Sequence, residues 1–397
     1  MRVLLFTGKG GVGKTTASAA TAALAASRGR KTLVLSTDPA HSLADALGVP
    51  LGGAPSEVDT GLYAMQVDAQ AAFERTWRDI QSYLVDVLAR AGVDALQAEE
   101  LTVLPGAEEV LALLAVREQV AGGVWDCVVV DCAPTGETLR LLALPDALTW
   151  YVEKVFPAQR RALRAVRPLL HRVSGPVVPQ DGVFDAVERL HAQLVDVRRV
   201  LTAPETSVRL VLTPEAVVVA EARRTLTSLA LYGYRVDGLV ANRVFPGGDP
   251  WRDAWVEAQT AQLDGVRADA PHLPLRVSPY LPTEPVGLPA LVALGEGLYG
   301  DDDPLAPGPA EEPVSVERTA DGFALSLALP LARLADVDLA RAGDELVLTV
   351  GGHRRVLALP SALRRCRVAG ATLSGGRLHV RFEPDPDLWP ASLGGPR

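Results

Sequence analysis

The sequence predicts an α/β fold with a mostly parallel sheet, followed by a separate all-β sandwich. A glycine-rich loop lies between an apolar run at residues 3–6 and an alanine-rich helical stretch at 16–27. Short apolar runs of strand type alternate with helical stretches up to about residue 300, which indicates parallel strands with both faces covered. Beyond residue 313, short alternating runs separated by glycine turns predict a small sandwich.

The glycine-rich loop has the spacing of a phosphate-binding loop. Residues 8–15 fit G-x-x-x-x-G-K-[ST], between a strand and a helix as the motif requires. Backbone N–H groups of such a loop turn toward an anion, and the helix N-terminus adds its positive dipole end. We expect Lys14 to reach the β- and γ-phosphates and Thr15 to ligate Mg²⁺. The loop residues expected to bind the nucleotide are Gly8, Lys9, Gly10, Gly11, Val12 and Gly13.

Two aspartates follow predicted strands. Asp131 ends the apolar run 124–131, an arrangement that holds the Mg²⁺ shell in phosphate-loop enzymes. The alternative for Asp131 is a cap after a buried strand, and the upstream loop favours the metal role. Asp38 follows the run 32–36 and could activate the water that attacks the γ-phosphate. Its own segment equally allows an Asp-Pro turn or a helix N-cap.

Composition excludes several classes of protein. A net charge of −9 over 397 residues leaves no basic footprint for nucleic acid. No apolar run approaches the length of a membrane span, and no signal peptide precedes the first strand, so we expect a cytoplasmic protein. The three cysteines form no C-x-x-C and the six histidines lack ligand spacing, so no zinc is expected.

The remaining segments divide the chain into domains. Helical stretches predominate in residues 68–120 and 147–200, where any single apolar stripe is most simply core packing. Residues 301–313 contain three aspartates, two glutamates and four prolines, and are predicted to be a linker. Residues 314–384 form the expected sandwich, and 385–397 a frayed tail.

Three ordered motifs give the first 300 residues a family resemblance. The segments 8–15, 38–43 and 131–140 resemble the phosphate loop, switch I and switch II of the arsenical pump-driving (ArsA) ATPase family. That family includes the ATPase that targets tail-anchored membrane proteins. The C-terminal region resembles the α-crystallin or small heat-shock-protein domain, on the runs 321–330, 343–350 and 370–380.

The resemblance implies roles for individual residues. Lys9 would be the signature lysine of the deviant Walker A class, which reaches the nucleotide of the partner in a homodimer. Thr16 would touch the α-phosphate, and Asp38 would activate the attacking water. Asn242 resembles the adenine-contacting asparagine of the family, and Glu221 a glutamate that reaches the nucleotide. The loop 279–285 would pack near the base, and residues 68–120 and 147–200 would form a helical subdomain.

The sequence also departs from the family pattern. It lacks the C-x-x-C that shares zinc across the dimer in targeting ATPases, and it has one phosphate loop where pump-driving ATPases have two. Cys127, Cys132 and Cys366 do not form a metalloid-binding set, and Glu137 stands where the family more often has histidine. The hypothesis is therefore a Mg²⁺-dependent ATPase, working as a nucleotide-gated homodimer on hydrophobic or membrane-protein clients. Two alternatives are an ATPase subunit energising an anion or metalloid efflux pump and a non-enzymatic, nucleotide-dependent holdase.

Overall fold

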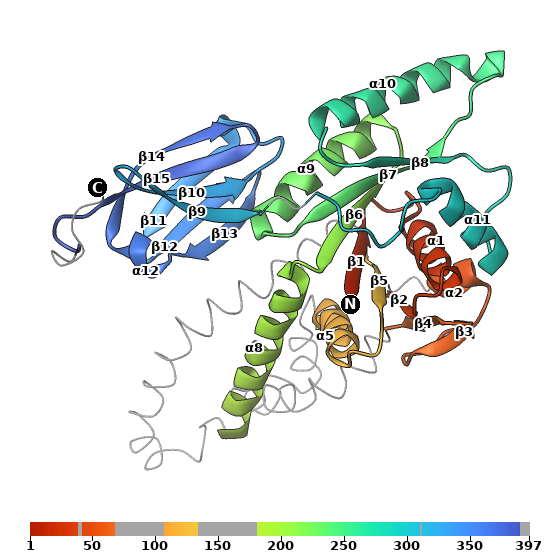
Figure 1. The fold of residues 1–397 in the computed structure, drawn as a ribbon, viewed down its shortest axis with the longest axis horizontal. Coiled ribbons are helices and arrows are strands. Elements are labelled where there is room, and N and C mark those ends of the chain that lie inside the picture. The colour runs from red at the N-terminus through yellow and green to blue at the C-terminus, as the bar shows by residue number, and fades with distance from the viewer. Residues whose placement is uncertain (39–41, 68–106, 134–180, 310–311, 390–397) are drawn as a thin grey trace, which may run out of the picture.

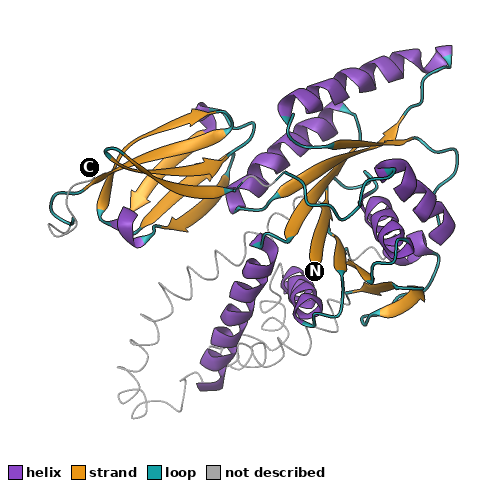
Figure 2. Ribbon diagram, in the orientation of Figure 1, coloured by secondary structure: helices purple, strands orange, loops and turns teal. Residues whose placement is uncertain are grey.

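The computed structural model describes residues 1–38, 42–67, 107–133, 181–309 and 312–389. It has two regions, a helix-covered sheet and a smaller body made mostly of strands (Figure 2). The predicted α/β fold with a C-terminal all-β sandwich is confirmed. Residues 68–106 and 134–180, which include much of the expected helical subdomain and Glu137, lie outside the described residues.

The central sheet has eight strands in the order β3-β4-β2-β5-β1-β6-β7-β8. All neighbours pair in parallel except β3 with β4, which are antiparallel. The antiparallel edge strand β3 is a feature that sequence reasoning missed, because its residues are polar and mostly exposed. The strands are β1 (Arg2–Thr7), β2 (Thr32–Ser36), β3 (Ser56–Asp59), β4 (Leu62–Gln66), β5 (Cys127–Asp131), β6 (Thr206–Leu212), β7 (Val236–Val244) and β8 (Leu275–Pro279).

Alternate residues of the central strands supply two hydrophobic cores, one on each face of the sheet. Leu4 and Phe6 of β1 pack in the core that contains α1, whereas Val3 and Leu5 pack in the core that contains α5 and α8. This explains why the strands are almost continuously apolar. The helices are α1 (Lys14–Ser27), α2 (Ser42–Leu47), α5 (Ala107–Ala121), α8 (Asp181–Thr202), α9 (Ala216–Tyr232), α10 (Asp253–Asp269) and α11 (Leu288–Tyr299), with a 3₁₀ turn at Pro250–Arg252.

The C-terminal body is a sandwich of a four-stranded sheet, β14-β15-β10-β9, and a three-stranded sheet, β11-β12-β13. Leucines that alternate along the strands, such as Leu325, Leu346 and Leu378, are buried between the sheets with Phe382. The elements are β9 (Val314–Thr319), β10 (Gly322–Ala328), β11 (Val337–Ala342), β12 (Glu345–Val350), β13 (His353–Ala358), α12 (Ser361–Arg364), β14 (Cys366–Ser374) and β15 (Arg377–Pro384), with a 3₁₀ turn at Leu334–Asp336.

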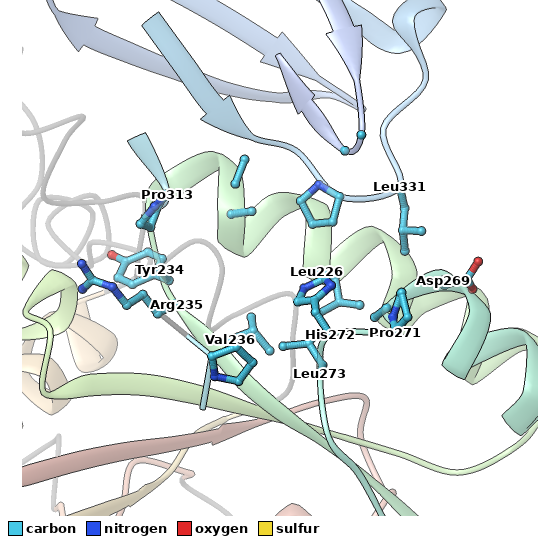
Figure 3. A pocket seen from close by; sticks show the side chains of 17 residues that line it. Leu226, Tyr234, Arg235, Val236, Asp269, Pro271, His272, Leu273, Pro313 and Leu331 are labelled. Atoms are coloured by element: carbon cyan, nitrogen blue, oxygen red, sulfur yellow. The ribbon is translucent and has the colours of Figure 1, made fainter. Parts of the chain in front are cut away.

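The sandwich packs against the C-terminal end of α9 (Figure 1). Leu231 of α9 is buried in the hydrophobic core of the sandwich, and the buried Arg355 of β13 donates a hydrogen bond to its carbonyl oxygen. Thr227 of α9 donates to the carbonyl oxygen of Pro330. A cavity of about 350 Å³ remains between the two bodies, with Leu331 opposite Leu226 and other apolar side chains (Figure 3). Sequence reasoning missed this interface.

Candidate nucleotide-binding site

The phosphate loop leaves β1 at the carboxyl edge of the sheet and ends in α1. Two of its glycines are required by close approach of other groups. A Cβ on Gly8 would lie 2.1 Å from the carbonyl oxygen of Val211, and one on Gly13 would lie 2.1 Å from Nδ2 of Asn242. Gly13 also has φ of +92°, in the left-handed region that disfavours other residues. The loop backbone therefore tolerates no side chain at these two positions.

The open part of the loop is its middle. Cβ atoms at Gly10 and Gly11 would meet nothing within 4 Å, and both residues are exposed, so this part of the loop has room for an anion. Lys14 is buried, and its Nζ donates to the carbonyl oxygen of Lys9 at 3.3 Å. The Lys14 ammonium thus already lies against the loop, where the phosphates would bring negative charge.

Asp131 is fully buried at the end of β5, beside the loop. Its Oδ2 accepts hydrogen bonds from the hydroxyls of Thr15, at 2.8 Å, and Ser36, at 3.2 Å. Its Oδ1 has no hydrogen-bond partner among the described residues. Burial raises the pKa of Asp131 to about 6, against the opposing effects of Thr15, Lys14 and Ser36.

This arrangement fits Mg²⁺. The cation prefers oxygen ligands and keeps several of its waters, so it needs few protein groups. Thr15 offers a hydroxyl oxygen, and Asp131 offers a desolvated carboxylate with one oxygen unused. The hydrogen bond between these two side chains joins residues 116 positions apart, and it brings the two predicted metal residues together.

Asp38 lies close to this pair. Its backbone N–H donates to Oγ of Ser36 at 3.2 Å, and Nε2 of Gln66 donates to its carbonyl oxygen at 3.3 Å. The negative charge of Asp38 is one of the influences that raise the pKa of Asp131. Asp38 is therefore held at the carboxyl edge, within electrostatic reach of the metal residues. Residues 39–41 of the expected switch I lie outside the described part of the chain.

The other expected nucleotide residues surround the same loop. Nζ of Lys9 lies 3.8 Å from Oε2 of Glu221 in α9, and both side chains are partly exposed. Nδ2 of Asn242, in β7, donates to the carbonyl oxygen of Val12 at 2.9 Å. Thr16 is half-buried in the first turn of α1. These four residues thus come from the phosphate loop, α1, α9 and β7.

Sequence reasoning missed Ser36, which connects Asp38 to Asp131, and Gln66, which donates to the carbonyl oxygen of Asp38. Both are buried polar residues at the carboxyl ends of β2 and β4. Ser36 is in register with Asp131 on the adjacent strand. A small polar residue that ends an apolar strand next to the Asp131 strand is the signal that could have identified Ser36.

The three cysteines are buried and do not form a common site. Burial raises the pKa of Cys127 to about 12 and also raises the pKa of Cys132, so neither thiol is readily ionised. Within the described ranges, no group of three or more His, Cys, Asp or Glu side chains is arranged to hold a metal ion. No described helix has the length and apolar character needed to cross a bilayer.

A glycine loop that opens a helix, with a buried aspartate beside its threonine, defines a P-loop nucleotide-binding protein. The chain belongs to the ArsA family of ATPases, since the anion-transporting ATPase family profile matches residues 1–300. An HSP20-like domain found in ArsA proteins matches residues 320–382.

Relatives extend this match over nearly the whole chain. A putative arsenical pump-driving ATPase of Chlorobaculum tepidum is 35% identical, over 96% of each chain. An uncharacterized protein of Streptomyces coelicolor is 40% identical, over 98% of this chain and 99% of its own. An ATPase ASNA1 homolog of Cryptosporidium parvum is 34% identical, over 60% of this chain and 64% of its own. The protein is thus an ATPase of this family, with a nucleotide as its substrate.

Proposed function

We propose that this ATPase hydrolyses ATP in a Mg²⁺-dependent reaction, as a nucleotide-gated homodimer that handles hydrophobic protein clients. The observation that carries the catalytic part is the contact between Thr15 and Asp131 beside the phosphate loop, with Oδ1 of Asp131 unpaired among the described residues. A buried carboxylate with an unused oxygen is costly unless a cation is bound there.

Different residues of the site bind the phosphates, hold the metal and activate the attacking water. The N–H groups at Gly10 and Gly11 and the ammonium of Lys14 bind the phosphates, and Thr15 and Asp131 hold the metal. When bound, Mg²⁺ neutralises charge on the β- and γ-phosphates. The carboxylate of Asp38 orients a water and accepts a proton as the water attacks the γ-phosphorus. The bond from phosphorus to the bridging oxygen breaks, which leaves ADP and phosphate.

The homodimer is supported by Lys9 and by family membership. The Lys9 side chain is 39% exposed and contacts the partly exposed Glu221, so its ammonium is accessible at the surface of the carboxyl edge. In the dimer, Lys9 of each chain would reach the nucleotide bound by the other. ATP would then hold the two chains together, and hydrolysis would release them.

The client role is supported by the relation to an ASNA1 homolog and by the HSP20-like domain. The name of the Chlorobaculum relative favours a second function, that of driving an arsenical efflux pump. For that function a metalloid would have to stimulate the ATPase, and the three buried cysteines offer no thiolate set. ATPase activity that is raised by arsenite or antimonite would support the pump function over the client function.

Asp38→Asn tests the catalytic assignment. The variant keeps the size of the side chain but loses its basicity, so we expect kcat to fall about 10²- to 10⁴-fold. Steady-state phosphate release with Mg²⁺, and with EDTA in its place, measures this. Asp45→Asn, at an exposed position of α2, is the matched control and should hydrolyse ATP normally. Unchanged turnover in Asp38→Asn would show that another group activates the water.

A further inference from the structure

The end of β7 contains an irregularity close to the phosphate loop. Between the pairs Ala241–Val277 and Val244–Pro279, β7 has one residue more than its parallel neighbour β8. The extra residue makes a β-bulge, a feature that is rare in parallel pairs and over-represented next to active sites. Arg243 lies in this bulge, and its φ of +57° is in the left-handed region that disfavours residues other than glycine. Such a conformation persists only where the surrounding structure holds it.

The side chain of Gln259, in α10, holds the bulge from both ends. Its Oε1 accepts a hydrogen bond from the backbone N–H of Phe245 at 2.7 Å, and its Nε2 donates to the carbonyl oxygen of Arg243 at 3.3 Å. The amide of Gln259 therefore spans Val244 and fixes a backbone group on each side of it. This support comes from a separate element, because α10 follows β7 in the chain and packs against it.

The bulge in turn orients Asn242 toward the phosphate loop. The backbone N–H of Arg243 donates to Oδ1 of Asn242 at 3.0 Å, and Nδ2 of the same amide donates to the carbonyl oxygen of Val12 at 2.9 Å. A Cβ on Gly13 would lie 2.1 Å from this Nδ2, so the amide packs directly on the loop backbone. A continuous series of hydrogen bonds thus connects α10 to the residues beside Lys14.

We propose that Gln259 is a positioning residue for nucleotide binding. It fixes the backbone of Arg243, which orients Asn242, which holds the loop backbone at Val12 in the shape that receives the phosphates. This inference rests on the binding of ATP in the proposed function, and it needs neither the hydrolytic step nor the homodimer.

The position of Gln259 predicts which kinetic constant it controls. Asp38 and Asp131 follow β2 and β5, which lie on the other side of β1 from β7. The hydrogen bonds of Gln259 lead to the loop backbone and not to these two carboxylates. Loss of Gln259 should therefore weaken nucleotide binding more than it slows the chemical step.

A purely structural Gln259 would only attach α10 to the sheet. Leu263 and Val266 of the same helix are buried in the core that contains α1, and they attach α10 by apolar contacts. The helix should therefore stay in place when Gln259 is replaced. The two roles differ in nucleotide affinity, which a role in attachment alone leaves unchanged.

Gln259→Ala tests the inference, with calorimetric titration of a non-hydrolysable ATP analogue and Mg²⁺ as the measurement. We expect the dissociation constant to rise about 10-fold, the effect of losing one well-placed hydrogen bond. At saturating ATP, kcat should stay within about twofold of the wild type, since the interaction affects binding rather than the transition state. Gln262→Ala, which removes the same type of side chain one turn further along α10, is the matched control and should bind like the wild type.

An unchanged dissociation constant in Gln259→Ala would overturn the inference, whatever happens to the thermal unfolding midpoint. Gln259→Glu gives a second variant should the alanine protein fold poorly. It keeps an acceptor for the N–H of Phe245 but loses the donor to Arg243, so its dissociation constant should lie between those of the wild type and Gln259→Ala. Binding by Gln259→Glu equal to that of the wild type would contradict the role of the bulge.

A substitution in the bulge itself gives the rescue. Glycine adopts a positive φ at no steric cost, so Arg243→Gly makes the bulge less dependent on Gln259. The loss of affinity caused by Gln259→Ala should therefore be smaller in the Arg243→Gly background than in the wild type. A loss of equal size in both backgrounds would show that Gln259 does not act through the bulge.

Hydrogen exchange gives an independent measurement that needs no ligand. In Gln259→Ala, amide exchange should become faster at residues 243–245 and also in the phosphate loop, at residues 9–14, while Gln262→Ala changes neither segment. Faster exchange confined to β7 and α10 would show that Gln259 only attaches the helix.

The outcomes also separate this inference from the proposed function. If the wild type binds the analogue but does not hydrolyse ATP, the proposed reaction fails, and the affinities of the Gln259 variants still decide the inference. If the wild type hydrolyses ATP and Gln259→Ala binds the analogue equally well, the inference fails alone. If the wild type binds no nucleotide in the presence of Mg²⁺, both fail.

Discussion

One buried aspartate lies at the amino ends of the parallel strands and another at their carboxyl ends. The two aspartates differ in the groups that donate hydrogen bonds to them. Asp237, at the amino end of β7, is 5% exposed, and its two oxygens accept hydrogen bonds from Arg2 and Arg209. Asp131, at the carboxyl end of β5, accepts hydrogen bonds from hydroxyls on one oxygen only. Asp237 is thus neutralised by cations of its own chain, and no arginine approaches Asp131 in the same way among the described residues.

The difference separates a structural charge from a functional one. Arg209 also donates to Tyr299 and to the carbonyl oxygen of Pro304, so the Asp237 cluster connects three strands to α11 and to the chain that leads to the sandwich. This cluster is complete without a ligand. In the described structure no cationic side chain is bonded to the carboxylate of Asp131, and that is the property expected of a metal residue.

The largest expected effect is a loss of protein stability when Asp237, at the amino ends of the strands, is replaced. Asp237→Asn removes the only carboxylate bonded to the side chains of Arg2 and Arg209 in the described structure, and leaves the buried Arg209 and the partly buried Arg2 without it. We expect the free energy of unfolding to fall by about 3–5 kcal/mol. Asp131→Asn, the matched variant at the other edge, should not destabilise the protein without Mg²⁺. Urea unfolding of both variants measures the difference, and equal losses would remove the distinction between the two clusters.

The second effect is a pH dependence that arises at the carboxyl edge. The folded pKa of Asp131, about 6, lies above its ordinary value of 3.8, so between these values the folded protein binds more protons than the unfolded one. The contribution of Asp131 to the free energy of unfolding should therefore decrease by about 3 kcal/mol as pH rises through this window, and then level off. The charged groups that act on Asp131 are Lys14 and Asp38.

Thermal unfolding from pH 4 to 7 without Mg²⁺ measures this contribution, with Asp131→Asn as the reference. The difference in stability between the variant and the wild type should grow with pH in favour of the variant. Mg²⁺ with nucleotide should raise the unfolding temperature of the wild type more than that of Asp131→Asn. A constant difference across the pH range would show that Asp131 titrates near its ordinary pKa.

The two clusters were not equally predictable from the sequence. The phosphate loop is a local pattern of eight residues, and the apolar run before Asp131 identifies its strand, so Thr15 and Asp131 were predicted as one site. Arg2, Arg209 and Asp237 belong to no motif, and each is one charged residue in or beside an apolar strand. Their pairing depends on strand order, since β1, β6 and β7 are neighbours in the sheet although they are distant in sequence.

The rest of the fold was also predictable only in part from the sequence. Periodicity predicted the parallel strands and the sandwich, because buried strands have a distinct apolar pattern. It did not predict that Leu231 of α9 packs in the core of the sandwich, because an apolar residue on a helix does not specify its partner. Asn242 and Glu221 were suggested by family resemblance alone, and their roles toward the nucleotide stay predictions.

The third effect tests how far the amino-edge cluster extends. The hydroxyl of Tyr299 lies 2.8 Å from Oγ1 of Thr21 and 2.9 Å from Nη1 of Arg209. Tyr299→Phe removes both contacts, but Thr21 keeps its bond to Ala17 and Arg209 keeps its bond to Pro304. We therefore expect a loss of about 1–2 kcal/mol in urea unfolding. A loss as large as that of Asp237→Asn would mean that the tyrosine, rather than the aspartate, holds the cluster together.

The smallest effect on stability is expected at Ser36, where the consequence for activity is greater. Ser36→Ala removes the hydrogen bond to Asp131 and leaves the backbone N–H of Asp38 without the Ser36 hydroxyl as acceptor. Stability should fall by only about 1 kcal/mol, because a single hydroxyl is lost. Since Asp38 and Asp131 are both less firmly held, kcat should fall more than KM changes. Ser36→Thr keeps the hydroxyl on a strand residue and should restore turnover. If Ser36→Ala turns over ATP like the wild type, Ser36 supports the fold alone.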